Sequence, residues 1–171
     1  MESPKGPDPR CTIEEPVRLT ALSVPFAAGR SIALPGHPII SCRLATAVTE
    51  WTGRIAAPVI ATGFGAELKA MRTGPGFACR PRNREPGAKL SAHGQGLALD
   101  IAGFDLADGR MVAVGPTPPS PAGAAALASI RTAACGWFLT VLGPGSDPSH
   151  ADHLHLDLQI HGRSESYRMC Q

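Results

Sequence analysis

Apolar residues recur at helical spacing in the first half of the chain, where intervals of four, three and four residues place them on one helix face. The stripe consists of Leu44, Val48, Trp51 and Ile55. Ser41 precedes it and is a favoured N-cap residue. We therefore expect a helix over about 42–57. It should end near Pro58, because proline lacks the backbone N–H of a helix interior and clashes with the preceding turn.

A second helix is expected over 121–134, where the sequence is rich in alanine. Ser120 can cap it, and Pro121 stands at the first helical position, where proline is tolerated. The side chains expected to face the core are Leu127, Ile130 and Ala134. The apolar run 138–142 then predicts a buried strand, and the Gly- and Pro-rich stretch 143–148 predicts a loop.

Prolines divide the beginning of the chain into short pieces. Four of them within residues 1–16 exclude a helix there and favour an extended lead-in. Residues 17–40 alternate short apolar runs with further prolines, which predicts short strands or loops. No internal repeat or domain-scale linker follows, so residues 17–171 are expected to form a single domain.

Two stretches alternate between apolar and polar residues with the period of a β-strand. In 97–102, the leucines and isoleucine share one face and Asp100 lies on the other, between two alanines. In 153–161 the apolar face holds Leu154, Leu156, Leu158 and Ile160. The polar face holds His153, His155, Asp157, Gln159 and His161.

If these two strands are neighbours, His93, Asp100 and His155 can meet at one point. Imidazole and carboxylate groups are zinc donors, and a catalytic zinc site needs three such ligands and one open position. Gly94 and Gly96 would let the backbone turn between His93 and the Asp100 strand. From spacing alone the alternative stays open, because a His-x-His pair on a strand is often only solvated.

Composition narrows the class of protein. The chain has 171 residues, of which 43% are hydrophobic and 18% charged, which fits a folded domain. Its net charge of +2, without a dense Lys/Arg stripe, argues against a nucleic-acid partner. No apolar run is long enough for a transmembrane segment. Residues 1–10 lack the apolar region of a signal peptide, so the protein is either cytosolic or begins after a removed signal.

The five cysteines are scattered and contain no CxxC pair. This spacing suits neither a zinc knuckle nor a thioredoxin motif. It favours two long-range disulfides and one odd thiol, and hence an oxidising compartment.

The run Ser91-Ala92-His93-Gly94-Gln95-Gly96-Leu97-Ala98-Leu99-Asp100 matches SxHxxGxAxD at every specified position. It resembles the signature of the D-Ala-D-Ala metallopeptidases, which share a superfamily with lysostaphin-type peptidases and the hedgehog signalling domain. Within this superfamily the chain is most similar to the bacterial extensin-like C-terminal domain proteins. Further matching stretches are Cys79-Arg80-Pro81-Arg82-Asn83, Thr140–Gly145 and the histidine-rich strand.

The resemblance implies that His93, Asp100 and His155 bind one Zn²⁺, and that Arg80 binds a substrate carboxylate. Ser91 and Gly96 would have structural roles in the motif. Asp152 stands where the D-Ala-D-Ala peptidases have a glutamate base, and His153 stands where the murein endopeptidases have a histidine. We place His153 slightly ahead of Asp152 as the proton-handling residue.

The resemblance also implies an α+β fold, a small and mainly antiparallel sheet with both helices on its apolar face. It implies a zinc peptidase acting on peptidoglycan peptide stems, periplasmic or secreted. The alternative is a non-enzymatic zinc-containing binding or structural domain at the cell envelope. For the cysteines we expect Cys11–Cys42 and Cys79–Cys135, with Cys170 odd. Asp157 is expected to orient an imidazole or to be a solvated carboxylate, and His150 lies in a loop beside the proposed site.

Overall fold

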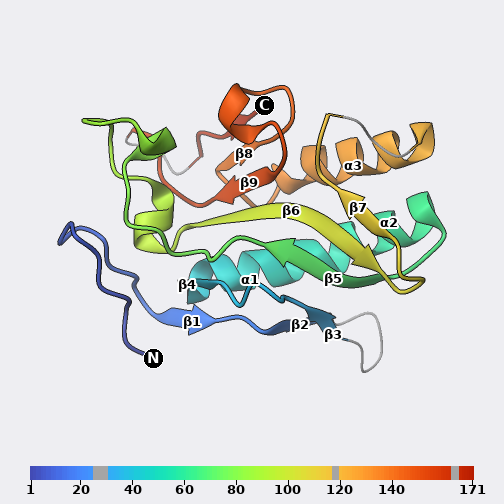
Figure 1. The fold of residues 1–171 in the computed structure, drawn as a ribbon, viewed down its shortest axis with the longest axis horizontal. Helices are drawn as coiled ribbons and strands as arrows, with labels where there is room; N and C mark the ends of the chain where they lie inside the picture. The colour runs from blue at the N-terminus through green and yellow to red at the C-terminus, as the bar shows by residue number, and fades with distance from the viewer. Residues whose placement is uncertain (25–30, 117–119, 163–165) are drawn as a thin grey trace.

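The computed structural model of the chain describes residues 1–24, 31–116, 120–162 and 166–171. In these ranges, eight strands form one sheet in the order β10-β8-β9-β6-β5-β3-β2, with β7 also paired to β6 (Figure 1). The strands are β2 (Ala21–Ser23), β3 (Ser31–Ala33), β5 (Leu68–Thr73), β6 (Ala98–Leu106), β7 (Met111–Ala113), β8 (Thr140–Leu142), β9 (Leu154–Asp157) and β10 (Met169–Cys170). A separate pair joins β1 (Pro16–Arg18) to β4 (Ile39–Ser41).

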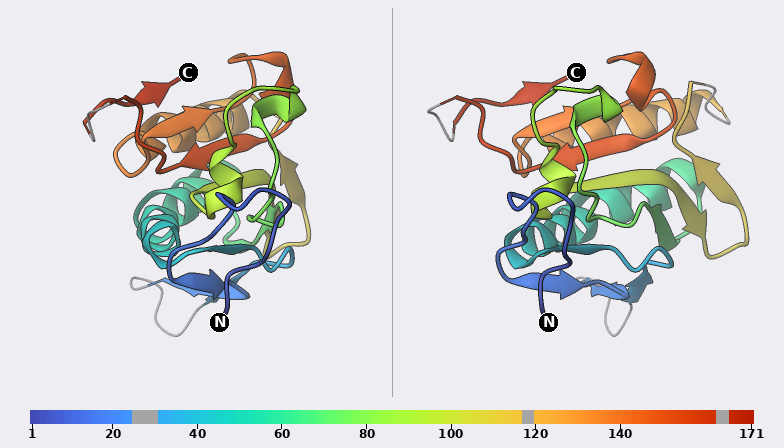
Figure 2. Two further views of the ribbon diagram at one scale, coloured as in Figure 1. Left: turned by 90° about the vertical axis from the view of Figure 1, so that its left-hand side faces the viewer. Right: turned by 60° about the vertical axis from the view of Figure 1, so that its left-hand side comes forward.

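The sheet is mixed, and most of its pairs are antiparallel. Only β10–β8 and β3–β5 are parallel among the described strands. The helices α1 (Cys42–Trp51), α2 (Ala57–Phe64) and α3 (Pro121–Ala134) cover one face of the sheet, as the views in Figures 1 and 2 agree. The α+β architecture predicted from the sequence is therefore confirmed.

The first helix begins where expected, because the Ser41 side chain accepts a hydrogen bond from the backbone N–H of Leu44. Its predicted end near Pro58 is wrong, since the helical path continues through α2 to Phe64. A π-helical turn, η1 (Thr52–Ala56), lies just before the proline, and the N–H of Ala57 bonds to the carbonyl of Thr52, five residues back. A wider turn at this point gives the proline ring room without ending the helix.

Helix α3 is confirmed with its predicted cap, as the Ser120 hydroxyl accepts from the N–H of Gly123. It packs closely on α2, where Gly63 faces Ala126 so tightly that an added Cβ would lie 2.5 Å from the alanine methyl. Ile130 and Ala134 are buried, while Leu127 is partly buried against the same core. At the centre of the core, the rings of Trp51 and Phe138 meet edge to face at 5.8 Å.

The two predicted chemistry-bearing strands are direct neighbours. Strands β6 and β9 pair antiparallel, with Asp100 opposite His155. Leu99 and Leu156 are fully buried on the helix side, so the predicted alternation holds at the centre of both strands.

The histidine-rich strand is shorter than predicted. β9 ends at Asp157, and Ile160 is exposed rather than part of the apolar face. The cause is local, because the N–H of Gln159 donates to the Asp157 side chain. This bond turns the backbone away from the sheet ladder.

The expected number of disulfides is confirmed, but the expected pairing is wrong. Cys11 is bonded to Cys79 and Cys135 to Cys170, and Cys42 is the free, exposed cysteine. Cys42 begins α1 on the outer surface, whereas β10 pairs with β8 and thereby brings Cys170 to the end of α3.

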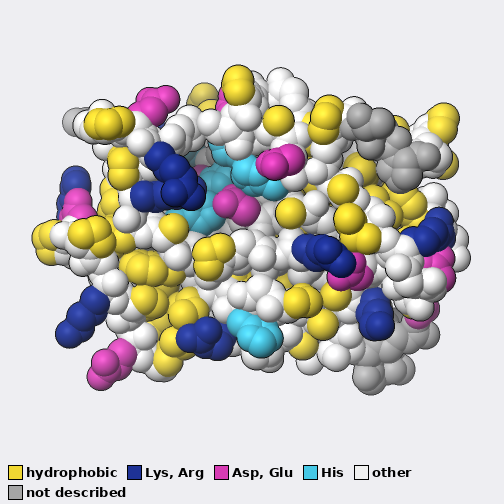
Figure 3. Space-filling view, viewed as in Figure 1, with side chains coloured by type: hydrophobic (Ala, Val, Ile, Leu, Met, Phe, Trp, Pro, Cys, Tyr) yellow, Lys and Arg dark blue, Asp and Glu magenta, His cyan; other side chains and the backbone are white. Residues whose placement is uncertain are grey.

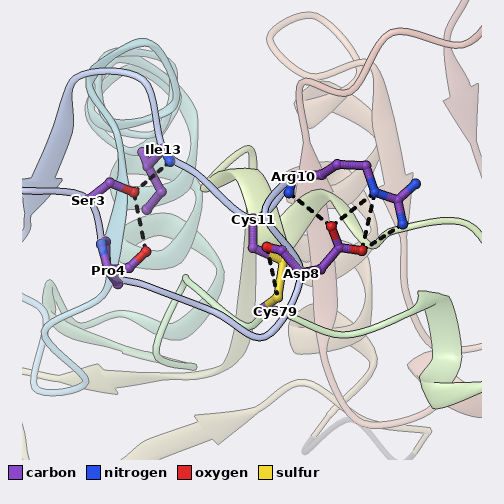
Figure 4. Close-up of a disulfide and its surroundings, with 7 residues drawn as sticks. All are labelled: Ser3, Pro4, Asp8, Arg10, Cys11, Ile13 and Cys79. Carbon is purple, nitrogen blue, oxygen red and sulfur yellow. Dashed lines mark hydrogen bonds and ion pairs between the residues drawn. A yellow bond between two sulfur atoms is a disulfide. The ribbon is translucent and has the colours of Figure 1, made fainter.

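The first disulfide fastens residues 1–15, which run as loops and turns before β1 (Figure 4). The segment has its own bonds, including one from the N–H of Ile13 to the Ser3 hydroxyl and a salt bridge between Asp8 and Arg10. Gly6 packs directly on the disulfide, since an added Cβ would lie 2.5 Å from the sulfur of Cys79. The N-terminal segment is therefore attached at Cys79, the residue that precedes Arg80.

None of the helices in the described ranges is long and apolar enough to span a bilayer.

Candidate metal centre

Three side chains from separate elements converge on the polar face of the sheet. His93 comes from the short 3₁₀ turn η3 (Ala92–Gln95), Asp100 from β6 and His155 from β9. One ligand atom from each lies within 4.8 Å of the others. The structure thus brings together all three predicted metal ligands.

His93 is oriented by a backbone carbonyl. Its Nδ1 lies 2.7 Å from the carbonyl oxygen of Gly76, which can only accept, so Nδ1 carries the proton. The Nε2 atom is then left with a lone pair. It is buried and makes no hydrogen bond with any described residue, although it lies 3.2 Å from Asp100 Oδ2. A metal-bound histidine typically has this arrangement: a backbone carbonyl fixes the ring through one nitrogen, and the other nitrogen is buried without a hydrogen-bond partner.

His155 lies between two carboxylates. Its Nδ1 is 2.9 Å from Asp100 Oδ1, and its Nε2 is 3.2 Å from Asp157 Oδ2. Burial by itself would lower the pKa of His155, but the two carboxylates outweigh this effect and raise the pKa to about 9. A metal taking the proton's place at Nδ1 would leave Asp157, which is buried, to orient the ring through Nε2.

Asp100 contacts three histidines. Burial opposes ionisation of this carboxyl, but the hydrogen bond from His155 and the closeness of the His93 ring outweigh burial and hold the pKa of Asp100 far below the usual range. The third neighbour is His153, whose Nε2 lies 3.6 Å from Asp100 Oδ1. The carboxylate is therefore ionised at neutral pH and available as a ligand.

The two candidate proton-handling residues form a pair. Asp152 Oδ1 accepts from Nδ1 of His153 at 2.9 Å, so the unprotonated Nε2 of a neutral His153 faces the site. The Asp152 side chain is 86% exposed and contacts the histidine rather than the ligand group. In this geometry His153 is the nearer of the two residues to the metal ligands.

A second histidine–carboxylate pair lies beside the first. His150, in the turn η4 (Pro148–His150), has its Nδ1 2.7 Å from Asp147 Oδ2. Its ring centroid is 5.2 Å from that of His153 and 5.4 Å from that of His155. Burial lowers the pKa of His150 more than Asp147 raises it, so the ring is neutral near pH 7. Sequence reasoning gave this residue little weight, because a loop histidine has no periodic pattern.

The two motif residues expected to be structural lie in the turn that leads into β6. Ser91 is buried at the start of η3, where its carbonyl accepts from the N–H of Gly94. Gly96 follows the turn with φ of 63°, a left-handed conformation that suits glycine. An added Cβ would also lie 2.8 Å from the side chain of Ile13.

The ligand group opens into a cavity of about 430 Å³. Figure 3 shows this hollow lined by histidine, with a basic cluster on one side. Arg80, the predicted carboxylate-binding residue, lines the cavity together with Arg82 and Arg84. A concave site with convergent polar groups of this kind is suited to binding a small ligand or a chain segment.

The whole chain, residues 1–171, matches the model of the family described as "Extensin-like protein C-terminus". No curated protein and no solved structure matches the chain.

Proposed function

The chain belongs to the extensin-like protein C-terminus family, and on this basis and from the site geometry we propose that it is a zinc-dependent peptidase. Its substrates would be the peptide stems of peptidoglycan, in the periplasm or outside the cell. The observation that carries the proposal is the buried, unpartnered Nε2 of His93 beside Asp100 and His155 at one cavity. The two disulfides support an oxidising compartment.

Zinc fits this donor set, since two imidazoles and one carboxylate are ligands that leave a catalytic position open. When bound, the ion would lower the pKa of a water molecule to about 7 and polarise the peptide carbonyl. His93 would bind through Nε2 and His155 through Nδ1, with their other nitrogens fixed by Gly76 and Asp157.

The protein's own proton acceptor would be His153. Its Nε2 faces the ligand group, and the Asp152 carboxylate fixes the tautomer in which Nε2 is unprotonated. His153 would take a proton from the attacking water and return it to the leaving amine, a role worth about 10²–10⁴-fold in rate. Asp152 would then act through His153 as a positioning residue.

Arg80 would orient the substrate. It lines the cavity and is half-buried, and its guanidinium has no carboxylate partner among the described residues. A substrate carboxylate would match the planar fork of this group.

The experiment is digestion of purified peptidoglycan with and without a chelator, followed by mass analysis of the fragments. We expect soluble peptide products that disappear with chelator and return with added zinc. His93→Ala protein, which lacks one ligand, is the matched control and should release none. If zinc binds and no fragment appears, the protein is instead a zinc-containing binding or structural domain.

A further inference from the structure

Three arginines occupy one wall of the cavity beside the ligand group. Arg80, Arg82 and Arg84 come from a single short stretch, and all three line the cavity. Figure 3 shows basic side chains gathered at the edge of the histidine-lined hollow. Arg80 and Arg82 are half-buried and Arg84 is exposed at the rim. The wall thus carries three positive charges, whereas a single substrate carboxylate would neutralise only one of them.

These charges are not neutralised within the described part of the chain. No carboxylate there forms a salt bridge with any of the three guanidinium groups. The acceptors that two of them do have are uncharged, namely the Pro81 carbonyl for Arg80 and the Gln159 amide oxygen for Arg82. Like charges on one concave wall repel each other unless an anion lies between them.

The backbone holds the arginines in place at a conformational cost. Asn83 and Arg84 are consecutive residues with φ of 52° and 61°, a region that non-glycine residues seldom adopt. The loop is closed by a bond from the N–H of Arg82 to the carbonyl of Lys89. Strained backbone of this kind tends to occur at functional sites.

Arg82 is also connected to the ligand group through a chain of hydrogen bonds. Its Nη2 donates to the Gln159 side chain, and the N–H of Gln159 donates to Asp157 Oδ1. The other oxygen of Asp157 contacts His155. The guanidinium is therefore held at a defined place relative to the candidate metal centre, with several of its five donors left for a ligand.

We propose that Arg82 and Arg84 form a second anion-binding position, so that the substrate is a peptide carrying a second carboxylate besides the one held by Arg80. One bidentate guanidinium satisfies one carboxylate, and three guanidiniums around one cavity therefore match more than one acidic group. The inference rests on the proposed function for its choice of a peptide. It adds a substrate specificity, because the protein would prefer a peptide with an acidic side chain over the same peptide with the corresponding amide.

The test uses zinc-loaded protein and N-acetyl pentapeptides ending in D-Ala-D-Ala. One glutamate is moved through the three preceding positions, and each peptide has a glutamine counterpart. Mass spectrometry shows whether a peptide is cleaved. For cleaved peptides we compare kcat/KM between the glutamate and glutamine forms, and for uncleaved peptides we compare the Kd measured by calorimetry. At one position the glutamate peptide should be favoured by about ten- to hundredfold.

The preference should vanish in Arg82→Gln and shrink in Arg84→Gln, while Arg43→Gln, an exposed arginine on α1, should retain it. Thermal melts show whether each variant is folded. If Arg82→Gln does not fold, Arg84→Gln alone tests the inference. Equal values for every glutamate–glutamine pair would overturn the inference, even if the peptides are cleaved. A binding preference without any cleavage would support it while contradicting the peptidase.

Discussion

His155 lies directly across the β6–β9 ladder from Asp100, and its Nδ1 is 2.9 Å from Asp100 Oδ1. Residues opposite each other on antiparallel strands are the closest cross-strand neighbours in a sheet. The register of one strand pair therefore sets the position of two of the three candidate ligands. His93 completes the group from a turn whose exit leads into the same strand β6.

The first prediction concerns metal content. The protein should bind one zinc ion, and His93→Ala or His155→Ala should lose it, because two remaining ligands hold zinc poorly. Elemental analysis after dialysis measures the ratio. His37→Asn is the control, since this exposed histidine has φ of 44° and asparagine tolerates that conformation. Zinc retained at full stoichiometry by both alanine variants would place the metal elsewhere.

The second prediction separates His153 from Asp152. His153→Ala should keep zinc and lose about 10²–10⁴-fold in hydrolysis of peptidoglycan peptides, as expected for a lost proton acceptor. Asp152→Asn should have a smaller effect, because this carboxylate only orients the ring. Rates and zinc content are measured on the same samples. A fully active His153→Ala with an inactive Asp152→Ala would instead make Asp152 the base.

The third prediction concerns the metal-free protein. The pKa of His155 is raised to about 9 by Asp100 and Asp157, so its protonation stabilises the fold. This stabilisation is complete below pH about 6.5, the unfolded pKa, and is lost as the pH rises through about 9. The free energy of unfolding should therefore fall by up to about 3 kcal/mol over that range.

Urea unfolding of chelator-treated protein between pH 6.5 and 9.5 measures this slope. His155→Gln is the reference, because other titrating groups contribute equally to both proteins. The nearby His93 and His150 rings remain in the variant. Equal slopes for the two proteins would show that His155 carries no such stabilising proton.

The fourth prediction concerns the cysteines. Removing Cys11–Cys79 by a double serine substitution should lower the unfolding free energy by about 4 kcal/mol in the chain-entropy model, since the bond closes a long loop. Cys42→Ser should have almost no effect, because this cysteine is free and exposed. Peptide mapping without reduction identifies the pairs directly. A recovered Cys11–Cys42 peptide would contradict the structure.

Local patterns in the sequence predicted much of the fold and the site. Both helix starts were found from a serine cap followed by apolar spacing, which depends only on neighbouring residues. The alternation around Asp100 and His155 placed both side chains on one face of their strands. His93 was a candidate only because Gly94 and Gly96 allow a turn into the Asp100 strand, and the motif resemblance then favoured it as a ligand; no periodicity includes this residue, because it lies in a short turn.

Features that depend on distant or unusual contacts were missed. The π turn before Pro58 and the left-handed residues at the arginine loop are backbone departures that no apolar spacing reveals. Disulfide partners are chosen by the folded topology, so the sequence spacing of Cys11 and Cys170 could not identify theirs. The early end of β9 follows from a single bond between Gln159 and Asp157, which overrides an alternating pattern that continues to His161.

The last prediction tests the turn that positions His93. Gly96→Ala should destabilise the protein by about 1–3 kcal/mol, from a left-handed φ of 63° and from overpacking against Ile13. Gly65→Ala is a matched control, because Gly65 has nearly the same left-handed conformation, with φ of 67°, but an added Cβ there meets nothing within 4 Å. The difference between the two variants therefore isolates the contact with Ile13.

Ile13→Ala combined with Gly96→Ala should recover part of that difference, since the smaller side chain leaves room for the new methyl group. Chemical unfolding measures stability, and zinc affinity reports whether His93 has moved. We expect Gly96→Ala to weaken zinc binding and Gly65→Ala, at the end of α2, to leave it unchanged, because only the turn at Gly96 leads from His93 into the Asp100 strand. Equal losses of stability in the two glycine variants, with unchanged zinc affinity in both, would mean that Ile13 does not constrain the motif.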